Sequence, residues 1–109
     1  MGRYITTTGT AGSVVRYNSG TPYTAVVNDR IICTAGGQTI TLPPTATSVD
    51  GDSVQIIDAT GAFAASNCTV AQNGVAYIAN QNASLTLNVN YCAVTLVYTS
   101  AYGWVLTSH

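Results

Sequence analysis

The sequence predicts an all-β protein, an antiparallel β-sandwich or jelly-roll-like barrel of about 9–11 short strands. The chain has no glutamate, no lysine and one methionine, and its alanines are common but are interleaved with threonine, valine and asparagine, so strong helix-forming segments are nearly absent. Threonine, valine, isoleucine and tyrosine, which favour strands, recur in short runs separated by turn residues. A chain of 109 residues has room for one core and therefore for one domain.

Turn residues delimit each expected strand in the first half of the chain. Glycines at positions 9 and 12 separate the first two runs, and Pro22 precedes the third. Gly36-Gly37 predicts a hairpin within residues 33–42, and Pro43-Pro44 ends its second strand because proline cannot continue a ladder. The expected strands here are residues 4–8, 13–17, 23–27, 30–34, 38–42 and 53–58.

The second half of the chain follows the same pattern. Asn73-Gly74 is a strong hairpin signal, and Asn90-Tyr91 marks a further turn. Leu85, Leu87 and Val89 alternate with polar residues, which predicts one buried face. Residues 54–57 and 94–97 are more continuously apolar, as in central strands covered on both sides. The expected strands here are residues 67–70, 75–78, 84–89, 92–98 and 103–106; a helix fits only residues 60–66.

Charge is unusually rare in this chain. Charged residues make up 6% of the sequence, and the net charge is −1 with only three arginines. Such a surface cannot neutralise phosphates, so we expect no nucleic-acid partner. No apolar run approaches the roughly 20 residues of a spanning helix, and no apolar stretch follows Arg3, so we expect neither a membrane span nor a signal peptide.

The residues that usually perform catalysis are also few. Asp50 and Asp52 flank a glycine in an expected turn, Asp58 ends a strand, and the single histidine is the last residue, His109. We therefore expect no enzymatic activity and no catalytic, cofactor or metal site. The three cysteines, at positions 33, 68 and 92, match no zinc spacing and are expected to be small buried hydrophobes. The alternative is that two of them form one disulfide, whose pairing the sequence does not assign.

Four aromatic residues gather near the C-terminus: Tyr91, Tyr98, Tyr102 and Trp104. Exposed aromatic rings can stack on the apolar faces of sugars, so these residues are candidate ligand or interface aromatics. The competing interpretation places Tyr98 and Trp104 in the core and Tyr91 and Tyr102 in turns.

Several segments in order resemble a small β domain of tailed-bacteriophage virion proteins, of the tail-fibre-tip or capsid-decoration type. The resemblance covers about residues 23–106. It implies a structural role, a homotrimer and no enzymatic activity. The segments that carry the resemblance are Tyr23 to Ile32, Gly36-Gly37, Thr39 to Pro43, Gly51 to Asp58, Leu85 to Asn88, Val94 to Tyr98 and Gly103-Trp104.

The expected organisation is an extended N-terminal arm, residues 1–20, before a single β-sandwich domain, residues 21–109. The arm is expected to anchor the protein by adding a strand to a neighbouring subunit or to another virion protein. Its candidate anchoring residues are Arg3, Tyr4, Ile5, Thr6, Thr7 and Thr8. The expected function is therefore a structural subunit of a phage particle, on the capsid or in the tail and fibre apparatus; the alternative is a carbohydrate-binding module that recognises a host glycan.

Overall fold

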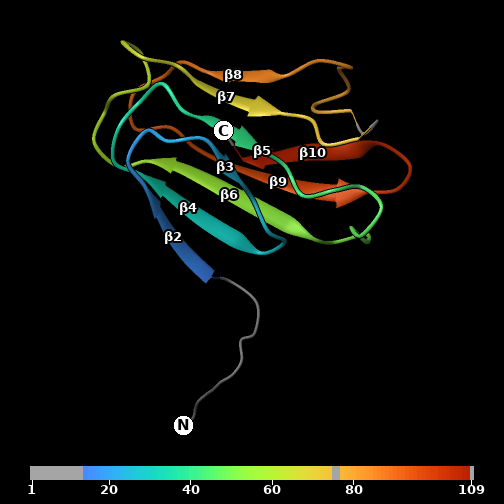
Figure 1. Ribbon diagram of the computed structural model, residues 1–109. Helices are drawn as coiled ribbons and strands as arrows, with labels where there is room; N and C mark the ends of the chain where they lie inside the picture. The colour runs from blue at the N-terminus through green and yellow to red at the C-terminus, as the bar shows by residue number, and fades with distance from the viewer. Residues whose placement is uncertain (1–13, 75–76, 109) are drawn as a thin grey trace, which may run out of the picture.

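The computed structural model describes residues 14–74 and 77–108, and these ranges contain nine strands and no helix. The strands form two sheets that face each other (Figure 1). The first sheet has the order β10-β9-β6-β4-β2, and the second has the order β3-β5-β7-β8. Their bounds are β2 Val14–Asn18, β3 Tyr23–Thr24, β4 Asp29–Cys33, β5 Thr39–Thr41, β6 Ser53–Asp58, β7 Cys68–Ala71, β8 Leu85–Leu87, β9 Ala93–Thr99 and β10 Gly103–Ser108.

The prediction of an all-β chain is confirmed, but the prediction of antiparallel sheets is wrong. From β2 to β7 the chain alternates between the two sheets, so β2, β4 and β6 are parallel neighbours and so are β3, β5 and β7. Only β8, β9 and β10 add antiparallel pairs. The sheets are mixed because each early connection crosses to the other sheet instead of turning back as a hairpin.

The glycine pair at residues 36–37 shows why the predicted hairpin of residues 33–42 is wrong. Gly37 has a φ of +85°, and a Cβ on Gly36 would overlap the backbone of Ser66. The amide of Gly37 donates to the Ser66 carbonyl at 3.1 Å. The glycines therefore make a close-packed corner that sends β5 into the opposite sheet from β4.

A second predicted hairpin differs in the same way. β7 ends before Asn73-Gly74 and pairs with β5 and β8, so the expected pairing across this turn is wrong for the described residues. The turn at Asn90-Tyr91 joins β8 to β9, which lie in different sheets. The turn at residues 100–102 does join an antiparallel pair, β9 and β10.

The core lies between the two sheets and is strongly apolar. β6 buries every second side chain, namely Val54, Ile56 and Asp58, while Gln55 and Ile57 are only half-buried. The prediction that β6 and β9 are covered on both faces is therefore wrong, although both are interior strands of their sheet. Alternation at β8 is confirmed for Leu87, which is buried, but Val89 is exposed. The fifteen core residues are Ala25, Ile31, Cys33, Ile40, Leu42, Val54, Ile56, Phe63, Cys68, Val70, Ile78, Leu87, Val94, Leu96 and Trp104.

In the first sheet, the last residues of β2 and β6 are polar and cap the turns that follow them. Asn18, Cys33 and Asp58 are register neighbours at the ends of β2, β4 and β6. The side-chain Oδ1 of Asn18 accepts the amides of Gly20 and Thr21, each at 3.1 Å, and Asp58 binds the turn that follows it in the same manner. A side-chain oxygen that accepts backbone N–H groups is an efficient way to close a buried corner.

Candidate functional site

The aromatic residues near the C-terminus do not form one platform. Trp104 is buried, and its ring packs edge-on against Tyr98 with the centroids 5.3 Å apart. Tyr91 is exposed, but its ring lies against Gly61, away from the others. Only Tyr98 and Tyr102 share a cavity, and a third ring, Tyr77, joins them there.

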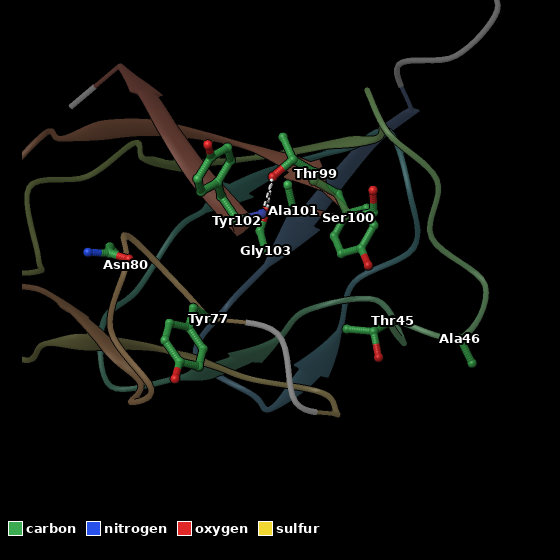
Figure 2. Close-up of a pocket in the computed structure, with 10 residues that line it drawn as sticks. Thr45, Ala46, Tyr77, Asn80, Thr99, Ser100, Ala101, Tyr102 and Gly103 are labelled. Carbon is green, nitrogen blue, oxygen red and sulfur yellow. Dashed lines mark hydrogen bonds between the residues drawn. The ribbon is translucent and has the colours of Figure 1, made fainter.

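The pocket has a volume of about 460 Å³ and is open to solvent. Figure 2 shows Tyr77 and Tyr102 on different sides of it, with Asn80 and Thr45 at its two ends. We call it the tyrosine pocket. Its lining is Thr45, Ala46, Tyr77, Asn80, Tyr98, Thr99, Ser100, Ala101, Tyr102 and Gly103.

Three segments that are distant in sequence build the tyrosine pocket. The turn between β9 and β10 supplies residues 99–103, and the loop between β5 and β6 supplies Thr45 and Ala46. The third segment, around Ile78, lies against β10 through a bridge from Ile78 to Trp104. The amide of Trp104 donates to the Tyr77 carbonyl at 2.7 Å, and the amide of Ala79 donates to the Trp104 carbonyl at 2.9 Å. No local signal predicts Tyr77 as a pocket residue, because this bridge alone brings it beside Tyr102.

Local hydrogen bonds hold the β9–β10 turn in place. The amide of Tyr102 donates to the Thr99 hydroxyl at 3.0 Å, and that hydroxyl donates to the Gly103 carbonyl at 3.1 Å. The Asp50 carboxylate accepts the Ser100 amide at 2.7 Å. Asp50 thus stabilises the turn, as Asp52 does its own turn through the Val49 amide at 2.9 Å.

The backbone around the pocket is in an uncommon conformation. Ala79 and Asn80 have φ values of +51° and +64°, and Gly103 has a φ of +75°. Positive φ in residues other than glycine is uncommon and gathers at functional sites more often than elsewhere. This conformation sets the direction of the Asn80 side chain at the pocket rim.

The two buried carboxylates are bound to the protein itself. Asp29 accepts the Tyr23 hydroxyl at 2.6 Å and the Val26 amide at 2.9 Å, and it pairs with Arg16 of β2 at 3.4 Å. This ion pair joins the start of β4 to the neighbouring strand β2. Asp58 accepts five backbone amides, from Thr60, Gly61, Ala62, Phe63 and Tyr91, at 3.0–3.3 Å.

We expect the stability of the protein to fall in acid in a manner that depends on Asp58. Burial by itself raises the Asp58 pKa, but the backbone amides of Tyr91 and the following turn hold it below its ordinary value. Because the folded pKa is lowered, its stabilisation is complete above the unfolded value of about 3.9 and is lost as the pH falls through the folded pKa. Urea unfolding at pH 6, 4, 3 and 2 measures this loss.

The Asp58→Asn variant is the control for the acid experiment, because asparagine cannot titrate. Its free energy of unfolding should be lower at pH 6 and should change less below pH 4 than that of the parent chain. An equal acid dependence in both proteins would assign the effect to other groups.

The cysteines act as packing residues. Cys33 and Cys68 are buried and Cys92 is half-buried, and all three are free thiols. A hydrogen bond with Cys33, together with burial, raises the pKa of Cys68, and burial raises the pKa of Cys92. These two thiols stay protonated near neutral pH and are therefore weak nucleophiles. Within residues 14–74 and 77–108, no group of three or more His, Cys, Asp or Glu side chains is placed to hold a metal ion.

Two further expectations from the sequence concern the N-terminal arm and the absence of a membrane span. The candidate anchoring residues Arg3, Tyr4, Ile5, Thr6, Thr7 and Thr8 lie outside the described residues. β2 falls inside the segment 1–20 that the sequence assigns to an arm, and it pairs with β4. In the described part of the chain, no helix is long and apolar enough to cross a membrane.

Comparison with known proteins adds no relative. No protein-family model matches the chain, and no curated protein matches it.

Proposed function

We propose that the protein is a structural subunit of a bacteriophage virion that assembles as a homotrimer and decorates the capsid or forms part of the tail and fibre apparatus. The proposal rests on the resemblance carried by the segments from Tyr23 to Trp104 and on one structural observation, the open apolar edge at β2. Virion proteins meet neighbouring copies over extended surfaces, so such an edge suits this role.

β2 is the last strand of its sheet. It pairs with β4 on one side, and no strand of the described chain pairs with the other. An edge of this kind is where a strand of another chain can add to a sheet. Figure 1 shows β2 at the border of the sheet, opposite to β10.

The side chains of β2 favour contact with protein over contact with water. Val14, Val15 and Tyr17 are 46%, 50% and 77% exposed. The only charged residue of the strand, Arg16, is paired with Asp29. Solvent-exposed edges usually carry lysine, proline or a bulge that prevents association, and β2 has none of these. We infer that a neighbouring copy covers this edge.

The molar mass in solution tests the assembly. Light scattering after size exclusion should give about 34 kDa, three times the 11.2 kDa of one chain. Val15→Lys places a charge on the exposed edge and should shift the mass to that of a single chain. Val15 is 50% exposed and is not a core residue, so we expect the free energy of unfolding of the isolated chain to change by less than about 0.5 kcal/mol.

Val89→Lys is the matched control. Val89 is 62% exposed and lies beyond the end of β8, outside the β2 edge. This variant should keep the mass of the parent protein. A monomeric parent chain, or a trimer that survives Val15→Lys, would contradict assembly through β2.

A second experiment tests the location. Gold-labelled antibody against the chain should decorate purified phage particles at the capsid or at the tail, and electron microscopy distinguishes the two. Particles that carry no label would contradict the virion role.

A further inference from the structure

We propose that the tyrosine pocket binds an uncharged saccharide. The inference is independent of the trimer and of the virion role, because the pocket is formed within one chain and lies at the β10 side of the fold, away from β2. The candidate aromatic residues are now Tyr77, Tyr98 and Tyr102, with polar side chains beside them, instead of the four aromatic residues that the sequence offered.

The aromatic rings supply the apolar part of the site. Tyr77 and Tyr102 are 46% and 72% exposed, and Tyr98 is supported from behind by the edge-on contact with Trp104. Rings of this kind offer a flat apolar face with a hydroxyl at the tip. Such a face matches the C–H side of a pyranose ring, whose other edges carry hydroxyl groups.

Three polar side chains of the pocket have no hydrogen-bond partner among the described residues. The side-chain amide of Asn80 and the hydroxyls of Thr45 and Ser100 make no hydrogen bond to any part of the chain that the structure describes. An amide offers both donors and an acceptor, and a hydroxyl does the same. This combination suits sugar hydroxyls, which also donate and accept.

The absence of charge decides the class of saccharide. None of the ten lining residues is ionisable near neutral pH. The Asp50 carboxylate is not part of the lining and is bound by the Ser100 amide at 2.7 Å. A sialylated or sulfated sugar would lose hydration on entering the pocket and would find no cation there, so a neutral sugar is favoured.

The size and rigidity of the pocket also fit. A volume of about 460 Å³ lies within the range of small-ligand sites. The hydrogen bonds from Trp104 to Tyr77 and from Tyr102 to Thr99 fix both walls before a ligand arrives. A preformed site loses less conformational freedom on binding than a mobile one.

The test begins with an array of oligosaccharides that holds neutral glucose, galactose, mannose and N-acetylglucosamine chains beside sialylated and sulfated ones. The purified full chain should bind at least one neutral glycan and none of the anionic ones selectively. The best neutral glycan is then titrated while the fluorescence of Trp104, the single tryptophan, is followed. Because Trp104 contacts Tyr98, occupation of the pocket should change this signal.

Variants then locate the site. Tyr102→Ala should weaken binding at least tenfold, and so should Asn80→Gly, which removes the amide but tolerates the positive φ. Tyr91→Ala is the control, because it removes an aromatic ring that is 68% exposed and lies outside the pocket. Thermal unfolding should show that Tyr102→Ala is folded.

Three results would overturn the proposal. They are binding to no neutral glycan, selective binding to anionic glycans, and binding that Tyr102→Ala leaves intact or that Tyr91→Ala abolishes. None of these bears on the molar mass, so a failure here is distinguishable from a failure of the virion role.

Discussion

Asp58→Ala is expected to lower the free energy of unfolding by about 3–5 kcal/mol. The carboxylate is 2% exposed and accepts five backbone amides. Alanine leaves these amides without their acceptor, and each buried amide that finds no other partner costs about 1–3 kcal/mol. The loss is not five times that value, because the turn can relax and admit water.

The loss should spread into the core. The turn that Asp58 closes carries Phe63, which is fully buried, and the fifth amide comes from Tyr91 in the turn before β9. Urea unfolding at pH 7 measures the difference. Asp50→Ala is the control, because Asp50 is exposed and accepts one amide, so its loss should be about 1 kcal/mol. Equal losses in the two variants would contradict the structural role of Asp58.

Gly103→Ala is expected to lower the free energy of unfolding by about 2–4 kcal/mol and to deform the tyrosine pocket. Gly103 has a φ of +75°, and a Cβ there would lie 2.5 Å from the Tyr77 carbonyl oxygen and 2.7 Å from its amide nitrogen. These atoms are backbone, so they cannot rotate away as a side chain can. The bridge between Ile78 and Trp104 must open to make room.

Gly51→Ala separates the two causes. Gly51 has a φ of +95°, but a Cβ there would meet nothing within 4 Å. This variant therefore suffers only the conformational penalty, about 1 kcal/mol. Chemical denaturation measures both variants, and Trp104 fluorescence reports the pocket in Gly103→Ala. Equal destabilisation of Gly103→Ala and Gly51→Ala would contradict the steric clash expected between a Cβ at position 103 and the Tyr77 backbone.

The two proposals assign opposite edges of the first sheet to different tasks. β2 would join neighbouring copies, and the β9–β10 turn would hold a neutral sugar. In a trimer three such pockets would act together, and linked weak sites bind a repetitive surface far more tightly than one site does. Assembly and recognition would then reinforce each other, although each is tested alone.

Local patterns in the sequence determined several features of this protein. The scarcity of helix-forming residues predicted an all-β chain, and alternation placed Leu87 in the core. The turn after residue 99 was predicted between two strands that do pair. The aspartates at positions 50 and 52 were assigned to turns, where both accept backbone amides. These features depend on residues a few positions apart, so composition and spacing are sufficient to predict them.

The tertiary structure alone decided the path of the chain. In the first sheet, Val14 pairs with Asp29, 15 residues later in the chain, and Arg30 pairs with Gln55, 25 residues later. Because these two spacings differ by 10 residues, the parallel strands leave no fixed repeat in the sequence. Gly36-Gly37 suits a hairpin as well as a corner, and only the backbone of Ser66 packed against it favours the corner. A local turn signal predicts that the chain bends, but it does not predict which sheet the chain enters next.

The candidate site divides in the same way. Tyr98 and Tyr102 are near each other in sequence and were predicted together, but Tyr77 is brought to them only by the bridge from Ile78 to Trp104. Trp104 was a candidate ligand aromatic, and the packing of the two sheets made it part of the core instead. The sequence determined which side chains were available, whereas pairing between distant segments determined which of them face solvent together, because that pairing depends on the burial of the whole core and on no single local preference.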